Sequence, residues 1–342
     1  FKNFELEFSP TKTLVVGPNG AGKSNILEAV YLLASGDSNR AVREDEMIKF
    51  GQDFAKVQAT SVKENGDSEN LDLTLTASPE RRLSKIAKVN GVKRSLGQLS
   101  GELKAVEFSP SNLDLVNGPP DVRRRYLNSV LSQISRQYRE SFSSYEKIRK
   151  QKNSLLGQIQ EGLANPTQLD LWNEKLLEFG TLVQEARREY FNYLKENVAG
   201  IVFEYTPSVI SKARLASFAE TEIAAGVSLI GPHRDDFGFI VPQGHPFREG
   251  ERGGLKDLNL AHFGSWGEQR MAVFELKLGE ISYFKDQTGN RPVLLLDDIF
   301  SELDGGHRRE VLERISSEST EQVVFTATDT EHVGQENLPG MK

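Results

Sequence analysis

Residues 17–24, Gly-Pro-Asn-Gly-Ala-Gly-Lys-Ser, have the composition and spacing of a loop that binds phosphate. An apolar run at 13–16 precedes the loop and a periodic apolar run at 25–33 follows it, which predicts the required strand, loop and helix. Glycines let consecutive backbone N–H groups turn toward phosphate oxygens. The candidate nucleotide ligands are Asn19, Gly20, Gly22, Lys23, Ser24 and Asn25.

Four side chains could carry out chemistry on a nucleotide held by this loop. Lys23 would place a positive charge at the β- and γ-phosphates, and the Ser24 hydroxyl is a suitable Mg²⁺ ligand. An apolar run at 292–296 leads into Asp297 and Asp298, as in a buried parallel strand whose carboxyl end faces a ligand. Asp297 is expected to hold Mg²⁺ through water. Asp298 is expected to polarise the attacking water, so Asp298 and Lys23 are the catalytic candidates.

The sequence has no Asn-Lys-x-Asp element, which would recognise guanine, and ATP is therefore the expected nucleotide. A second candidate phosphate contact lies at 263–270, Phe-Gly-Ser-Trp-Gly-Glu-Gln-Arg, directly before an apolar-periodic run. Ser265 and Gly267 would then lie at a helix start, where a hydroxyl, free N–H groups and the helix dipole favour phosphate. An ordinary capped helix explains the same pattern, so both interpretations remain open.

Predicted turns divide the N-terminal part of the chain into short strands. Alternating runs at 54–62 and 71–77 flank one Asn-Gly pair, and runs at 86–89 and 92–94 flank another. This pattern predicts antiparallel hairpins in a β-meander, followed by a strand near 105–108.

A helical insertion follows. Apolar residues recur every three to four positions from Pro120 to about Leu163, which predicts one long helix. After the break at 165–167, a second periodic run begins at Leu169 and continues to Val198. The two runs predict an antiparallel helical pair that forms an exposed arm.

Composition limits the classes of protein that fit. The chain has 342 residues, of which 37% are hydrophobic and 27% charged, and no apolar run approaches the roughly 18 residues of a membrane span. It has no cysteine, which excludes disulfides and thiolate metal sites and fits the cytoplasm. The formal net charge of -7 argues against a protein that coats nucleic acid indiscriminately.

Basic residues are nevertheless concentrated locally. Residues 123–152 contain nine lysines and arginines against two glutamates, and residues 81–104 contain seven against one. This enrichment predicts salt-sensitive contacts with DNA phosphates rather than with base edges, and a solvated helix face with uneven charge is the alternative. The candidate DNA contacts are Arg123, Arg124, Arg125, Arg136, Arg139 and Lys150.

The order of these motifs resembles the head domain of ABC-type ATPases of the SMC class. That order is phosphate loop, long helical insertion, Ser-x-Gly-x-Gln loop, Asp-Asp strand and Ser-Glu-Leu-Asp at 301–304. Segments 106–116, 118–127 and 231–236 (Gly-Pro-His-Arg-Asp-Asp) narrow the resemblance to the RecF family of bacterial recombination mediators. It implies an α/β fold, namely a P-loop ABC-type ATPase head with an antiparallel β-meander and an inserted α-helical second domain.

The resemblance also implies a function. Such proteins are ATP-dependent DNA-binding proteins of DNA repair, replication and the SOS response, with ATP and Mg²⁺ as cofactors. They form an ATP-dependent homodimer, recognise gapped or single-strand/double-strand junction DNA, and help RecR and possibly RecO load recombinase onto single-stranded DNA. A cytoplasmic, nucleoid-associated protein without a membrane partner is expected.

In such heads, the Ser-x-Gly loop of one protomer contacts the γ-phosphate held by the other. The resemblance therefore implies contacts in trans by Ser265, Gly267 and Gln269, with Asp304 at the dimer seam. Thr328 stands at the switch position, where many ABC proteins have histidine, and Trp266 stands where the superfamily has glycine. A hydroxyl cannot carry the charge of imidazole, and Asp298 is shorter than the usual glutamate, so slow ATP hydrolysis is expected. We also expect DNA to stimulate this weak ATPase activity.

The predicted domains are 1–118 and 230–342, the two parts of the ATPase domain, with the helical arm domain at 119–229. His233 and Arg234 could contact DNA or nucleotide, or form a hydrogen-bonded turn that joins the two halves. The alternative function is an ABC-type nucleotide-binding subunit that is mechanically coupled to a protein partner.

Overall fold

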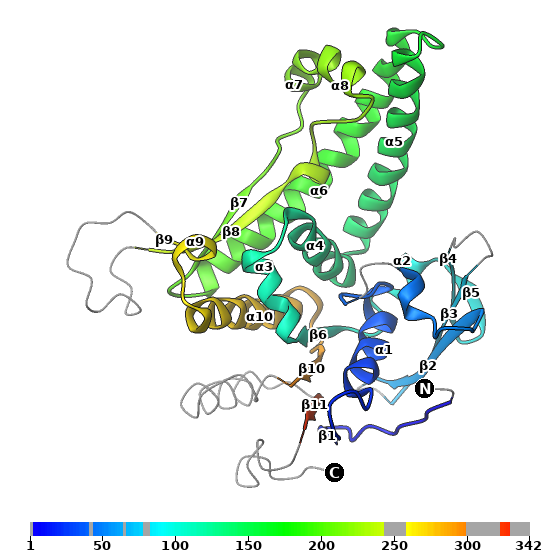
Figure 1. Ribbon diagram of the computed structural model, residues 1–342, viewed down its shortest axis with the longest axis vertical. Coiled ribbons are helices and arrows are strands. Elements are labelled where there is room, and N and C mark those ends of the chain that lie inside the picture. Colours follow the sequence, from blue (N-terminus) through cyan, green and yellow to red (C-terminus); the bar gives the residue numbers. More distant parts are fainter. Residues whose placement is uncertain are drawn as a thin grey trace. The chain divides into compact units, whose positions relative to one another are not determined.

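The structure is a computed structural model that describes residues 3–40, 44–63, 66–77, 83–242, 258–298 and 322–328. The chain forms two compact units, one of Phe1–Asn112 with Lys277–Lys342 and the other of Leu113–Leu276 (Figure 1). Helix α10 (Trp266–Thr288) begins in the second unit and ends in the first.

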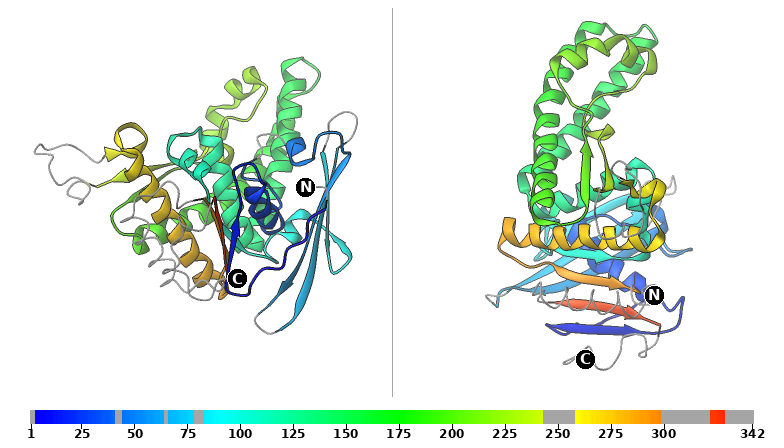
Figure 2. Two further views of the ribbon diagram at one scale, coloured as in Figure 1. Left: turned by 60° about the horizontal axis from the view of Figure 1, so that its bottom comes forward. Right: turned by 90° about the vertical axis from the view of Figure 1, so that its left-hand side faces the viewer.

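A parallel sheet forms the centre of the first unit. Its described strands follow the order β1 (Lys12–Val16), β11 (Val323–Ala327), β10 (Val293–Asp297) and β6 (Ala105–Phe108). All neighbouring pairs are parallel, and β1, β11 and β10 lie side by side in Figure 2. Helix α1 (Lys23–Ser35) packs Leu27, Tyr31 and Ala34 into the same buried cluster as Leu295 and Val324. The predicted strands and first helix are confirmed.

The β-meander is also confirmed. Strands β2 (Phe54–Val62), β3 (Ser68–Ala77), β4 (Leu83–Val89) and β5 (Val92–Arg94) form an antiparallel sheet in chain order. Asn90 and Gly91 both have positive φ, 51° and 77°, as a two-residue turn between twisted strands requires. The short described elements of this unit are η1 (Glu44–Met47), α2 (Leu96–Leu99) and η2 (Pro110–Leu113).

Two long helices dominate the second unit. Helices α5 (Arg136–Gln160) and α6 (Leu169–Asn197) lie side by side and are joined through the 3₁₀ turn η3 (Pro166–Gln168) (Figure 1). Tyr145 and Ile148 of α5 share a buried cluster with Leu176 of α6, which confirms the helical pair. The other described elements are α3 (Asp114–Asn117), α4 (Pro120–Ile134), β7 (Val202–Thr206), α7 (Lys212–Ser217), α8 (Ala219–Ala225), η4 (Pro232–Arg234), β8 (Asp236–Val241), β9 (Leu258–Asn259) and α9 (Leu260–Phe263).

The prediction of one continuous helix from Pro120 to Leu163 is wrong. The chain breaks at Ser135, whose φ of −115° and ψ of 117° are extended, so α4 ends there and α5 begins. The Ser135 side chain accepts a hydrogen bond from the Tyr138 backbone N–H at 3.1 Å, which caps the new helix. The apolar spacing continues across the break, and periodicity alone therefore could not locate it.

A buried polar cluster joins α6 to the Gly-Pro-His-Arg-Asp-Asp segment. The Asp235 carboxylate is fully buried and accepts hydrogen bonds from Arg187 (2.7 Å), the Gln184 amide (2.7 Å) and the Ser208 N–H (2.8 Å). A buried carboxylate is tolerated only with such partners. The segment is thus a hydrogen-bonded turn that holds the second unit together.

The boundaries of the two compact units differ from the boundaries of the predicted domains. Residues 230–276 lie in the same unit as the helical pair, because β8 pairs with β7 and Asp235 binds α6. The functional division into 1–118, 119–229 and 230–342 stays a prediction. In the described part of the chain, no helix combines the length and apolarity needed to cross a membrane.

Candidate nucleotide-binding site

The phosphate loop connects β1 to α1 at the carboxyl edge of the parallel sheet. Gly20 and Gly22 have φ of 81° and 94°, a region that side chains other than glycine rarely adopt. The Gly17 N–H donates to the Ala327 carbonyl at 3.2 Å, which ties the start of the loop to the end of β11. Asn19 is exposed on the loop, and Asn25 is exposed in the first turn of α1.

Lys23 is buried at the base of the loop. Its ammonium donates to the carbonyls of Gly17 at 2.6 Å and Pro18 at 3.1 Å. These bonds satisfy a charge that would otherwise be buried without a partner. A phosphate oxygen would be a stronger acceptor for the same ammonium, because charge-assisted hydrogen bonds exceed those to neutral carbonyls.

Ser24 and Asp297 meet across the end of the sheet. The Ser24 hydroxyl donates to Asp297 Oδ1 at 2.9 Å, and the Thr326 hydroxyl donates to the same oxygen at 2.8 Å. A hydroxyl and a carboxylate in contact are the donor set that Mg²⁺ prefers, and the residues present therefore fit this ion. These two residues are 273 positions apart in the sequence, and both were predicted to hold Mg²⁺.

Asp298 follows directly and has a φ of 48°, which is uncommon for a residue other than glycine. Its N–H donates to the Thr326 hydroxyl at 3.0 Å, so one threonine contacts both aspartates. Thr328 lies one residue past the end of β11, which pairs with both β1 and β10. The phosphate loop, Asp297, Asp298 and Thr328 thus come to one edge of the sheet.

Three residues near this edge of the sheet were not predicted from the sequence. Thr326 is one of them, and the only signal for it was a polar residue within an apolar strand. Arg40 pairs with Asp297 at 3.6 Å, and no pattern pointed to it. Glu107 is the single charged residue of β6 and is buried, and burial raises its pKa, while the Asn39 amide donates to it at 3.1 Å.

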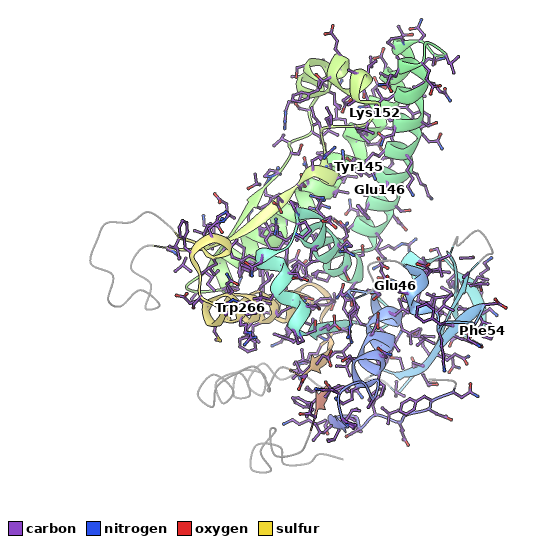
Figure 3. All side chains as sticks on the ribbon, in the orientation of Figure 1. Glu46, Phe54, Tyr145, Glu146, Lys152 and Trp266 are labelled. Carbon is purple, nitrogen blue, oxygen red and sulfur yellow. The ribbon has the colours of Figure 1, made fainter. Side chains whose placement is uncertain are left out.

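The second predicted phosphate surface begins α10. Residues 264–267, which we call the signature turn, contain Ser265 and Gly267. The Ser265 N–H donates to the Glu268 carboxylate at 2.6 Å and the Glu268 N–H donates to the Ser265 hydroxyl at 3.3 Å, a capping box. Trp266, at the start of α10 in Figure 3, is 68% exposed. The capped-helix interpretation is thus realised, and it leaves the turn on the surface of the second unit.

Gln269 differs from its predicted role in trans. Its side chain is buried, and its amide bonds to groups of its own unit. Asp304, the predicted seam residue, lies outside the described residues.

The predicted DNA contacts divide into internal and exposed groups. Arg123 is buried, binds the Asp236 carboxylate through two nitrogens at 2.6 and 2.9 Å, and donates to the Gly118 carbonyl. Arg124 donates to the Asp235 carbonyl, and burial lowers its pKa. Arg123 is therefore held by the carboxylate and carbonyls of its own unit as a structural residue, and a role in DNA contact stays a prediction.

The remaining candidates lie nearer to solvent. Arg125, Arg136 and Lys150 are exposed, although Arg136 pairs with Glu140 at 2.7 Å and Arg125 with Asp121 at 3.7 Å. Arg139 donates to the Ser132 carbonyl. Exposed pairs of this kind are weak, and phosphates could compete for their guanidinium groups.

His233 has a structural environment. Its Nε2 lies 2.9 Å from the Ser228 carbonyl and its Nδ1 lies 2.6 Å from the Tyr145 hydroxyl. A carbonyl can only accept, so Nε2 carries the proton and Nδ1 accepts from Tyr145. Burial lowers the pKa of His233 to about 4, which keeps the ring neutral at physiological pH. Arg234, in contrast, is exposed.

The fold and site together define an α/β ABC-type ATPase head with a β-meander and a helical second domain. The family model described as "RecF/RecN/SMC N terminal domain" matches residues 1–339. The chain belongs to this family.

Individual relatives show which members of this family the chain resembles. The chain is 35% identical to the DNA replication and repair protein RecF of Shouchella clausii, over 94% of this chain and 88% of that protein. It is 33% identical to the protein of the same description from Bacillus cytotoxicus, over 100% and 93%. A solved structure described as the recombination mediator protein RecF with ATP in the RecFOR pathway superposes with a TM-score of 0.81, at 27% identity over 95% and 88% of the two chains. The resemblance to RecF is confirmed.

Proposed function

We propose that the protein is an ATP-dependent DNA-binding ATPase of DNA replication and recombinational repair. The observation that carries the proposal is the contact of Ser24 with Asp297 directly behind the phosphate loop. This contact is what a P-loop ATPase needs in order to hold a metal-bound triphosphate. The relatives named as DNA replication and repair proteins, and the ATP complex of one of them, support the nucleotide and the process.

Each chain binds ATP through the loop at 17–24 in this proposal. Backbone N–H groups of the loop receive phosphate oxygens, and the Lys23 ammonium transfers from the Gly17 and Pro18 carbonyls to the β- and γ-phosphates. Ser24 and Asp297 would hold Mg²⁺, which when bound neutralises charge on the phosphates.

Asp298 orients the attacking water and accepts its proton. The backbone of Asp298 is fixed by the Thr326 hydroxyl, which also contacts Asp297. The short Asp298 side chain and the absence of imidazole at Thr328 predict hydrolysis slower than the roughly 1–100 per second typical of kinases. ATP then acts mainly as a clamp, and DNA is proposed to stimulate its hydrolysis.

Two copies of the chain close on the nucleotide in the proposed dimer. The signature turn of one copy offers the Ser265 hydroxyl and the N–H groups of the α10 start to the γ-phosphate of the other. The Ser265 hydroxyl accepts from the Glu268 N–H, so its own O–H can donate to phosphate. Asp304 is proposed to lie at the seam.

Closure brings the exposed basic residues of the second unit to gapped or junction DNA. Among the candidates we favour Arg125, Arg136 and Lys150, which are exposed, and Arg124 and Arg139, which are half-buried, over the buried Arg123. Backbone contacts make the binding insensitive to sequence. We further propose RecR, and possibly RecO, as protein partners, recombinase loading on single-stranded DNA as the outcome, and a cytoplasmic, nucleoid-associated location.

The test measures association state and affinity for gapped DNA with ATP, with ADP and without nucleotide. The variants are Lys23→Met, which loses the phosphate contact, and Asp298→Asn, which keeps the shape but loses the base. We expect ATP to promote both dimer and DNA complex, Lys23→Met to lose both, and Asp298→Asn to prolong both. DNA affinity that is independent of nucleotide in all three proteins would favour the mechanically coupled subunit instead.

A further inference from the structure

The side chain of Gln269 is a hydrogen-bonded hub beneath the signature turn. Its Nε2 donates to the carbonyls of Leu260 at 2.8 Å and Gly264 at 3.1 Å, and its Oε1 accepts from the Asn117 amide at 2.7 Å. Only 6% of Gln269 is exposed. Both ends of the amide are therefore committed within the second unit, and neither is available to a nucleotide.

Asn117 anchors the other end of this amide. If the Gln269 amide were reversed, Oε1 would face two carbonyl oxygens that can only accept, so the Leu260 and Gly264 carbonyls select its orientation. The N–H₂ group of Asn117 donates to Oε1 in that orientation and holds the amide from the opposite side. Asn117 thus supports two further bonds in which it does not take part.

The end of α3 that carries Asn117 is itself fixed. Gly118 donates to the Asp114 carbonyl at 2.8 Å, and a Cβ at Gly118 would lie 2.4 Å from that oxygen. The buried Arg123 donates to the Gly118 carbonyl at 2.8 Å. Asn117 therefore projects from a rigid support.

The signature turn approaches its own support closely. A Cβ at Gly264 would lie 2.7 Å from Leu260 Cδ2 and 2.8 Å from the Leu260 carbonyl oxygen. Leu260 is fully buried in α9. Gln269 binds the Leu260 and Gly264 carbonyls beneath the turn, beside the bond from the Gly264 N–H to the Leu260 carbonyl at 3.0 Å.

We propose that Asn117 is a positioning residue for the signature turn and acts through Gln269. It holds the N–H groups and hydroxyl of residues 264–267 in the conformation that receives the γ-phosphate of a second copy. The consequence for association rests on the proposed function, whereas the consequence for the turn itself does not.

The test uses Asn117→Leu, which removes the donor at nearly constant size, and Asn117→Asp, which turns an acceptor toward Gln269. Asn192→Asp, on the exposed face of α6, controls for the added charge. Three quantities are measured on each full-length protein: hydrogen exchange of the turn without nucleotide, ADP affinity, and association with ATP.

We expect faster exchange at 264–268 in both Asn117 variants and unchanged ADP affinity, because ADP requires the phosphate loop alone. Loss of one hydrogen bond at one turn should weaken ATP-driven association about fivefold. Because a symmetric dimer uses two turns, the association constant should fall about 25-fold in total. The Asn192 control should behave as wild type. A general loss of structure would also lower ADP affinity, and that outcome would count against positioning.

Unchanged exchange at the turn in both Asn117 variants would overturn the proposal, whatever happens to association. Faster exchange with undiminished association would overturn the link to the second copy. If wild-type protein fails to associate with ATP while exchange responds as expected, the proposed function is wrong and the positioning of the turn by Asn117 stands.

Discussion

Asp297 is contacted by groups from three separate segments of the chain. Ser24 from the start of α1 and Thr326 from β11 share one carboxylate oxygen, and Arg40 pairs with the other. The parallel register explains the convergence, because Asp297 lies opposite Thr326 and Val16 lies opposite Ala327. Both oxygens of the acidic group thus have partners within the protein.

Substitution of Ser24 by alanine should affect metal-dependent binding selectively. The variant loses one oxygen ligand and the 2.9 Å contact with Asp297. We expect ATP affinity in the presence of Mg²⁺ to fall about tenfold, on the order of 1–2 kcal/mol, and affinity in EDTA to change little. Titration with a fluorescent ATP analogue measures both. Ser24→Thr keeps the hydroxyl and should retain the Mg²⁺ effect; an equal loss with and without Mg²⁺ would argue against metal ligation.

Glu107 should make stability depend on pH. Burial raises the pKa of the folded carboxyl above its ordinary 4.5, so the folded protein holds this proton more tightly than the unfolded chain. The associated stability is present below pH 4.5 and is lost as pH rises through the folded pKa. Glu107→Gln cannot ionise, and we expect it to be more stable than wild type at pH 7 and to lose this dependence. Urea unfolding between pH 4 and 8 measures the difference; a less stable variant at pH 7 would contradict the assignment.

At the scale of elements, local signals predicted most of the fold. The phosphate loop, the Asn90-Gly91 turn and the apolar strand before Asp297 each carry a residue pattern whose physical cause is local. Each was found where it was predicted. The Ser24–Asp297 contact also followed from sequence, because strand ends of a parallel sheet meet at one edge.

Other features depend on tertiary contacts that leave no local pattern. The break at Ser135 interrupts an apolar stripe that continues on both sides, so capping decided where the helix ends. Arg123 belongs to a basic run, yet its bond to Asp236, 113 positions later, buries it. Gln269 fits a signature pattern, but its side chain turns inward to the Leu260 and Gly264 carbonyls and to Asn117, which lies 152 positions away.

Exposed lysines on α5 should contribute more to DNA binding than exposed lysines on α6. Lys147 and Lys150 are exposed on α5, and their joint replacement by alanine should weaken gapped-DNA binding and make the slope of log affinity against log salt shallower by about 2. Lys175 and Lys195, exposed on α6, provide a control with equal charge loss. An equal effect of both pairs would show that net charge, and not the α5 surface, determines binding.

Arg123→Ala should instead destabilise the protein. Its charge-assisted bonds to Asp236 at 2.6 and 2.9 Å are lost, at a cost of roughly 2 kcal/mol in the free energy of unfolding. Chemical denaturation measures this cost. A variant with wild-type stability and weakened DNA binding would restore Arg123 as a DNA contact.

At the scale of the whole molecule, the phosphate loop and the signature turn belong to different compact units. In the proposed dimer, one ATP is enclosed by the loop of one copy and the turn of another. ATP would then be both ligand and cross-link. Its hydrolysis would release the dimer and the DNA.

A mixture of two complementary variants tests this enclosure of ATP by two copies. Lys23→Met keeps an intact signature turn but cannot hold ATP, and Ser265→Arg keeps an intact phosphate loop but blocks its turn. We expect neither variant to associate with ATP alone, and the mixture to form heterodimers with one complete site, detected by sedimentation. Wild-type association and hydrolysis by Ser265→Arg alone, with no heterodimer in the mixture, would show that ATP is not enclosed by two copies.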